Sequence, residues 1–164
     1  MPADNIILRR AENADADACA AVLAPFILNT AVNMHGAPLP PSYFAALIAK
    51  RAHFFVAEQK GEVCGYACAD EWNARCGYAG TMEVSVYIRQ PAQNGGTGGR
   101  LLTALLDSMR AGGIRAAVAL IALPNPPSVR LHEKLNFAPC GVMPKVGWKF
   151  NAAHDIGVWV CPLV

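Results

Sequence analysis

The apolar positions of this chain recur with two periods, which predict an alternation of strands and helices. Alternating or continuous apolar runs are typical of strands, and apolar residues three or four positions apart are typical of amphipathic helices. The predicted strands are residues 6–9, 53–59, 63–70, 81–88, 116–123, 137–142 and 154–160. The predicted helices are residues 15–29, 42–51, 99–109 and 126–135, with a kink or break at Pro25 in the first of them.

The order of these elements predicts an α/β fold, more closely an α+β mixed sheet of about seven strands with four helices on both faces. Strand 81–88 is expected to pair antiparallel with its predecessor. Strand 116–123 is expected to run parallel to strand 81–88, because a helix makes the crossover between them. A chain of 164 residues favours one domain, so we expect a single domain over residues 1–164.

A glycine-rich turn, Gln93 to Gly98, joins strand 81–88 to the next helix and has the pattern Q-x-x-G-x-G. Glycines let the backbone approach a ligand without a Cβ in the way, and the positive end of the helix dipole attracts anions. The turn therefore predicts a pyrophosphate site, although an ordinary flexible loop has the same composition. A Rossmann motif is excluded, because the glycines come past mid-chain and residues 113–123 contain no acid.

The amino-acid composition limits the classes of partner that this chain is expected to bind. Hydrophobic residues make up 54% and charged residues 16%, which argues against disorder. A formal charge of +2 is too small to indicate nucleic acid or a membrane surface, and no apolar run approaches the ~20 residues of a membrane helix. The six cysteines lack metal-ligand spacing and are expected to be buried reduced thiols. We expect a cytoplasmic protein without metal, nucleic-acid or membrane binding.

Glu83 is the residue that most suggests catalysis. Strand alternation puts it on one face with Thr81, Ser85 and Tyr87. A carboxylate in the middle of a central strand is costly unless it is paired or catalytic. It could act as a general base and take a proton from a substrate, directly or through a water molecule. The alternative is a structural carboxylate that pairs with Arg75 or with a backbone amide.

Four segments then carry a resemblance to a known family. They are TMEVSVY (81–87), NPPSVRLHEKL (125–135), VGWKF (146–150) and HDIGVW (154–159). With the element order and the glycine turn, they make the chain similar to the GNAT acetyltransferase superfamily. The closer resemblance is to its phosphinothricin acetyltransferase and amino-acid N-acetyltransferase branch, and it extends from residue 7 to residue 160.

The resemblance implies transfer of an acetyl group from acetyl-CoA to the primary amine of a small amino-acid-like acceptor by direct attack. Phosphinothricin and methionine sulfone or sulfoximine are the implied types of acceptor. The backbone of residues 86–88 would pair with the amides of the pantetheine arm, and the backbone amides of residues 94–99 would hold the pyrophosphate. The implied acetyl-CoA-binding residues are Val86, Tyr87, Ile88, Gln93, Asn94, Gly95, Gly96, Thr97, Gly98, Gly99, Asn125 and Ser128.

The resemblance also implies a second catalytic residue, His132, beside Glu83. An imidazolium could protonate the leaving thiolate, or the ring could help to deprotonate the amine; the alternative is a polar residue near a helix end. Arg75 and Tyr78 match the branch's substrate loop, and an arginine fork suits a carboxylate. The implied acceptor-binding residues are Met34, Arg75, Tyr78, Thr81 and Lys149.

The chain departs from the branch in two places. Asn94 and Gly95 stand where glycine and a basic residue are common, so acetyl-CoA affinity could be lower. Asn33 and Met34 replace the usual Thr-Phe in the loop that shapes the acceptor pocket, so the acceptor is the least transferable feature. A protein N-terminal or polyamine acetyltransferase and a catalytically silent acyl-CoA-binding module remain open.

A homodimer is also expected, because the branch is usually dimeric. Trp148, Phe150 and Trp159 offer apolar surface for an interface, although they could equally belong to the core.

Overall fold

The computed structural model describes residues 5–50, 53–90 and 92–164. Its seven strands form one mixed sheet in the order β1-β2-β3-β4-β5-β7-β6. The strands are β1 (Ile6–Arg10), β2 (Phe54–Gln59), β3 (Glu62–Glu71), β4 (Thr81–Ile88), β5 (Ala116–Leu123), β6 (Ala138–Lys149) and β7 (Ala152–Pro162). The helices are α1 (Ala16–Asn29), α2 (Pro41–Lys50), α3 (Thr97–Ala111) and α4 (Pro126–Lys134), with short 3₁₀ turns η1 (Asn13–Asp15), η2 (Cys76–Tyr78) and η3 (Ala92–Gly95).

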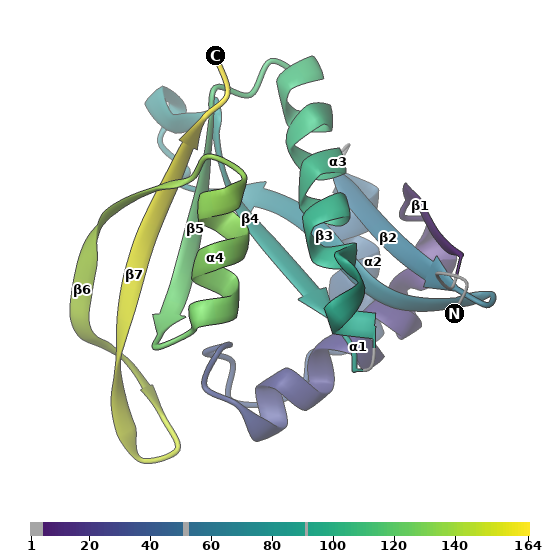
Figure 1. Ribbon diagram of the computed structural model, residues 1–164, viewed down its shortest axis with the longest axis horizontal. Coiled ribbons are helices and arrows are strands. Elements are labelled where there is room, and N and C mark those ends of the chain that lie inside the picture. The colour runs from purple at the N-terminus through teal and green to yellow at the C-terminus, as the bar shows by residue number, and fades with distance from the viewer. Residues whose placement is uncertain (1–4, 51–52, 91) are drawn as a thin grey trace.

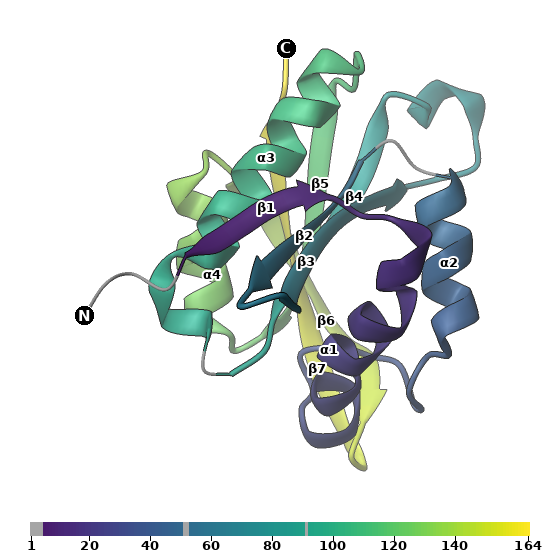
Figure 2. The same ribbon diagram turned by 90° about the vertical axis from the view of Figure 1, so that its right-hand side faces the viewer.

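The four helices cover both faces of the sheet (Figures 1 and 2). Helices α1 and α2 lie on one face, where Ile27 and Phe44 pack into an apolar cluster with β2 and β3. Helices α3 and α4 lie on the other face, where Leu101 and Leu105 of α3 pack into a second cluster with the central strands. The predicted fold class is therefore confirmed.

The sheet opens between β4 and β5. These two strands are parallel and pair only from Thr81–Ala116 to Glu83–Val118. Beyond that point β4 stays bonded to β3, and β5 stays bonded to β7. Because each strand is held by its outer neighbour, the two diverge toward their carboxyl ends, as Figure 1 shows. This divergence creates the site described below.

Three sequence predictions of local structure were wrong. The predicted break at Pro25 does not occur: helix α1 continues through Pro25, because the packing of its buried face, including Val22 and Ile27, outweighs one missing hydrogen bond. Helix α3 begins at Thr97 rather than near residue 99, because N–H groups in a first turn have no helical partner and glycine costs less there.

The third wrong prediction is the end of β6, which extends to Lys149 instead of stopping at residue 142. It forms a long hairpin with β7 through a turn at Phe150 and Asn151, both with positive φ. Most residues of β6 are exposed, so they do not need to be apolar. The pattern of apolar residues therefore does not reveal where this strand ends. The last residue of the predicted helix 42–51 lies outside the described residues.

Candidate active site

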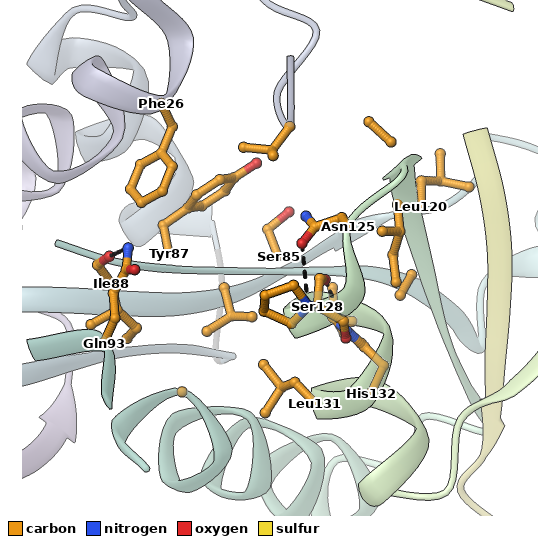
Figure 3. Close-up of a pocket in the computed structure, with 18 of the residues that line it drawn as sticks. Phe26, Ser85, Tyr87, Ile88, Gln93, Leu120, Asn125, Ser128, Leu131 and His132 are labelled. Carbon is orange, nitrogen blue, oxygen red and sulfur yellow. Dashed lines mark hydrogen bonds between the residues drawn. The ribbon is translucent and has the colours of Figure 1, made fainter. Parts of the chain in front are cut away.

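A cavity of about 420 Å³ opens where β4 and β5 separate, and we call it the donor cavity (Figure 3). Residues 84–88 and 119–122 line it from the two strands. The rest of its wall comes from the glycine turn, from the start of α4, and from Phe26, Thr30 and Val32 at and after the end of α1. Of the residues predicted to bind the donor, those that line this cavity are Val86, Tyr87, Ile88, Gln93, Gly96, Gly98, Gly99, Asn125 and Ser128.

The glycine turn is fixed in place and leaves its backbone bare. The side-chain Nε2 of Gln93 donates to the carbonyl oxygen of Ile88 at 2.7 Å, which ties the turn to the end of β4 (Figure 3). Gly96 precedes α3 with a φ of +74°, a conformation that favours glycine, and a Cβ there would meet nothing within 4 Å. Gly96, Gly98 and Gly99 line the donor cavity, so the cavity adjoins the positive end of α3, where the first N–H groups have no partner within the helix.

Two of the predicted donor-binding residues do not line the donor cavity. Gly95 is exposed and does not line the donor cavity. Thr97 is fully buried, and its hydroxyl has no hydrogen-bond partner among the residues that the structure describes. Thr97 thus lies beneath the turn rather than on its surface. The side chain of Asn94 lies outside what the structure describes.

Asn125 begins α4 at the edge of the donor cavity. Its side-chain oxygen accepts a hydrogen bond from the backbone N–H of Ser128 at 3.3 Å, and Pro126 follows it in the first turn (Figure 3). This is ordinary N-capping, and the same residue also faces the cavity. Its role as an N-cap is therefore compatible with the predicted contact to the donor.

A second cavity of about 490 Å³ adjoins the first, and we call it the acceptor cavity. The two share a wall that includes Val32, Ser85 and Tyr87. The acceptor cavity also contains Glu83 and, from the loop after α1, Met34. A molecule in one cavity can therefore meet a molecule in the other at this common wall.

Glu83 is half-buried in the acceptor cavity and makes no hydrogen bond or ion pair within the described part of the chain. Burial raises its pKa, and the charge of Asp70 on β3 raises it further. Arg75, its expected partner in the structural reading, is exposed at the start of η2 and forms no ion pair with it. A carboxylate with a raised pKa and no partner is suited to accept a proton.

His132 of α4 lies on the donor cavity and not on the acceptor cavity. It is only 4% exposed, and its Nδ1 lies 2.8 Å from the backbone carbonyl oxygen of Ser128. Nδ1 must donate in this contact, which leaves Nε2 of the neutral ring as an acceptor. Burial lowers the pKa of His132. The geometry thus favours the neutral ring over the imidazolium.

The predicted acceptor-binding residues are only partly brought together. Met34 lines the acceptor cavity, but Thr81, Tyr78 and Arg75 line neither cavity. Lys149 is buried and donates from Nζ to the backbone oxygen of Asn33 at 2.6 Å, so it contacts the cavity-forming loop rather than the cavity. The loop from Arg75 to Tyr78 is exposed to solvent. The predicted contact of this loop with the acceptor therefore rests on the sequence resemblance and not on the shape of either cavity.

Sequence reasoning missed Asn33, whose side-chain Nδ2 donates to the hydroxyl oxygen of Tyr87 at 3.0 Å. It also assigned Tyr87 to the donor site through its backbone alone, whereas its side chain borders both cavities. The Asn33-Met34 pair, which replaces the usual Thr-Phe, was the one sign in the sequence that this loop differs from that of the branch.

The expectation of buried thiols holds for four cysteines, whereas Cys76 and Cys140 are exposed. In residues 5–50, 53–90 and 92–164 there is no cluster of three or more His, Cys, Asp or Glu side chains that could hold a metal ion. The described helices include none long and apolar enough to cross a membrane.

A mixed sheet that opens between two parallel strands beside a glycine turn and a helix N-terminus can accommodate a phosphate-bearing ligand. The family model described as "Acetyltransferase (GNAT) family" matches residues 24–137. The chain belongs to this family of acetyltransferases, which confirms the resemblance seen in its sequence.

Individual relatives agree with this assignment. The chain is 38% identical over 155 residues to a phosphinothricin N-acetyltransferase of Streptomyces viridochromogenes, covering 93% of this chain and 85% of the relative. It is 43% identical over 96 residues to an L-methionine sulfoximine/L-methionine sulfone acetyltransferase of Pseudomonas paraeruginosa, covering 58% and 56%. The structure of yncA from Salmonella typhimurium with its cofactor acetyl-CoA matches with a TM-score of 0.93 at 32% identity, covering 98% of this chain and 95% of that one.

Proposed function

We propose that this chain transfers the acetyl group of acetyl-CoA to the primary amine of a small amino-acid-like acceptor. The observation that carries the proposal is the meeting of two cavities at Ser85 and Tyr87, one beside the glycine turn and one containing Glu83. The family and the relatives' substrates support the same assignment.

The residues of the donor cavity fit acetyl-CoA. The bare backbone at Gly96 and the first turn of α3 would bind the pyrophosphate. The carboxyl half of β4 does not pair with β5, so its backbone on that side would pair with the amides of the pantetheine arm. This path ends at the wall shared with the acceptor cavity, where the thioester would be presented to the amine.

Glu83 would supply the proton transfer that the reaction needs. An amine arrives as an ammonium ion and must lose a proton before its lone pair can attack the thioester carbonyl carbon. The Glu83 carboxylate takes that proton, directly or through a water molecule. The C–N bond then forms and the C–S bond breaks; the attacking nitrogen gives up its second proton, and the leaving CoA thiolate takes up one proton, so that the amide and free CoA result. His132, as a neutral ring on the donor side, would assist as a proton acceptor.

The acceptor is proposed to be of the phosphinothricin or methionine sulfone and sulfoximine type, as for the relatives. Recognition of its carboxylate by Arg75 stays a prediction, because Arg75 is exposed and lines neither cavity.

The test is a thiol-release assay with acetyl-CoA and a panel of amino acids, methionine sulfone, phosphinothricin, polyamines and a peptide N-terminus. Turnover that favours the amino-acid-like amines supports the proposal, and preference for polyamines or the peptide refutes the acceptor class. Acetyl-CoA binding without turnover on any amine would instead identify a catalytically silent acyl-CoA-binding module.

A homodimer and a cytoplasmic location are also proposed. Trp148 and Phe150 are 69% and 58% exposed on the β6–β7 hairpin and offer apolar surface for a second copy. Trp159 is buried and donates from Nε1 to Glu133, so it belongs to the core rather than to an interface. The free cysteines suit a reducing compartment. A monomer mass in light scattering at micromolar concentration would refute the dimer.

A further inference from the structure

The loop after α1 is fastened to the sheet through Asn33. The side-chain Nδ2 of Asn33 donates to the hydroxyl oxygen of Tyr87 at 3.0 Å, and its Oδ1 accepts from the backbone N–H of His35 at 2.8 Å. Its backbone oxygen accepts from Nζ of Lys149 at 2.6 Å. Three elements far apart in the sequence therefore meet at one residue on the rim of the acceptor cavity.

These contacts fix the direction of the Asn33–Tyr87 hydrogen bond. A backbone N–H can only donate, so the atom of the Asn33 amide that faces His35 must be the oxygen. The amide nitrogen then faces Tyr87 and can only donate to it. The Tyr87 hydroxyl oxygen is consequently the acceptor, and its own proton is left for another partner.

No group in the described part of the chain accepts that proton in a hydrogen bond. The ring of Tyr87 is held against Phe26 of α1 with centroids 5.3 Å apart, which limits where the hydroxyl can point (Figure 3). Tyr87 borders both the donor and the acceptor cavity. A phenol proton without a described acceptor is thus held on a side chain that lines both cavities.

We propose that Tyr87 donates a hydrogen bond to the thioester carbonyl oxygen as it becomes negatively charged, and that Asn33 is the positioning residue that turns the Tyr87 proton toward it. The inference rests on the proposed acetyl transfer, since it assigns a donor to the oxyanion of that reaction. Burial raises the pKa of Tyr87, so the phenol keeps its proton at neutral pH. The hydrogen bond from Lys149 to the backbone oxygen of Asn33 keeps the Asn33 side-chain amide in position.

The test compares Asn33→Asp, Asn33→Ala and Tyr87→Phe. Aspartate still accepts from His35 but must also accept from Tyr87, so the loop stays fastened while the Tyr87 proton turns away from the cavities. All three variants are expected to lose roughly 10²-fold in kcat, the usual loss for one oxyanion donor, with acetyl-CoA affinity and acceptor KM near those of the parent. Tyr87→Phe combined with Asn33→Asp should lose no more than either alone.

Loop fastening alone would give a different result. Asn33→Asp would then behave like the parent, and Asn33→Ala would raise the acceptor KM rather than lower kcat; that pattern overturns the proposal. Lys149→Met should reproduce a milder form of the Asn33→Ala loss in kcat. Lys145→Met, at an exposed lysine of the same hairpin, should not alter the kinetics.

A second measurement is independent of activity. The Asn33 amide lowers the pKa of Tyr87 by donating to its oxygen, so Asn33→Asp should move the Tyr87 titration to higher pH. Ultraviolet difference titration, with Tyr87→Phe to identify the signal, measures this shift. An unmoved titration refutes the hydrogen bond even if the parent protein acetylates no amine tested, whereas a moved titration with an inactive parent would refute the proposed function instead.

Discussion

Glu83 of β4 lies directly opposite Asp70 of β3 in the antiparallel register, and both side chains line the acceptor cavity. Burial raises the pKa of Glu83, and the negative charge of Asp70 raises it further. The pair therefore brings the base closer to the pH at which the enzyme would work, and it gives the cavity an attraction for the ammonium form of an amine.

Replacing Asp70 by asparagine should shift the pH dependence of catalysis. Without the Asp70 charge the pKa of Glu83 falls, so Glu83 stays ionised to lower pH and the acid limb of the kcat/KM profile moves toward acid. The measurement is a pH–rate profile of parent and Asp70→Asn. Asp107→Asn, at an exposed pair with Arg110, is the matched control and should leave the limb in place. A limb that Asp70→Asn does not move would show that Glu83 does not set it.

His132 should make the fold sensitive to acid. Burial lowers the pKa of His132 in the folded state. Below about pH 6.5 the unfolded chain therefore binds a proton at this residue that the folded chain does not bind. Stability is therefore fully present above that pH and is lost as the pH falls toward the folded-state pKa. His132→Asn should flatten the fall of the unfolding temperature between pH 7 and pH 5. His53, whose pKa is also lowered, leaves a residual slope in both proteins. Equal slopes would contradict the buried neutral ring.

Gly96→Ala should separate donor binding from stability. An alanine at a φ of +74° costs roughly 1–2 kcal/mol of strain, and its methyl group would occupy the space assigned to the pyrophosphate. Gly113→Ala places the same residue at a φ of +77° beyond the end of α3 and serves as the control. Both variants should melt earlier, but calorimetry should show weakened acetyl-CoA binding for Gly96→Ala alone. Equal acetyl-CoA affinity in the two variants would remove the phosphate site from this turn.

Much of the fold and of the donor site could be predicted because their signals are local. The turn from Gln93 to Gly98 has its own glycine pattern, and Glu83 breaks the apolar rhythm of a buried strand. The contacts of Asn33 with Lys149 and Tyr87 join residues 116 and 54 positions apart, and no local period encodes such contacts. For the same reason the exposed strand β6, which buries almost no side chain, was predicted too short.

Arg75→Ala tests the one acceptor contact that rests on the sequence motif. If Arg75 binds the acceptor carboxylate, the acceptor KM should rise by one to two decades, because a charge-assisted pair contributes roughly 1.5–3 kcal/mol. The acetyl-CoA affinity should not change, since Arg75 lies away from the donor cavity. Steady-state kinetics with methionine sulfone measure the effect, and unchanged kinetics would withdraw Arg75 from the acceptor site.

Glu83→Gln is the most direct test of the account. The substitution keeps the shape of the side chain but removes its ability to take a proton at neutral pH. The variant should bind acetyl-CoA like the parent in calorimetry, and its unfolding temperature should not fall, because a half-buried carboxylate without a described partner is replaced by a neutral group. Its kcat should fall by about 10²–10⁴-fold, and the acid limb of its pH–rate profile should disappear. Glu62→Gln, at an exposed pair with Arg89, should retain parental kcat. Full activity in Glu83→Gln, accompanied by earlier melting, would show that Glu83 is a structural carboxylate and would contradict the mechanism.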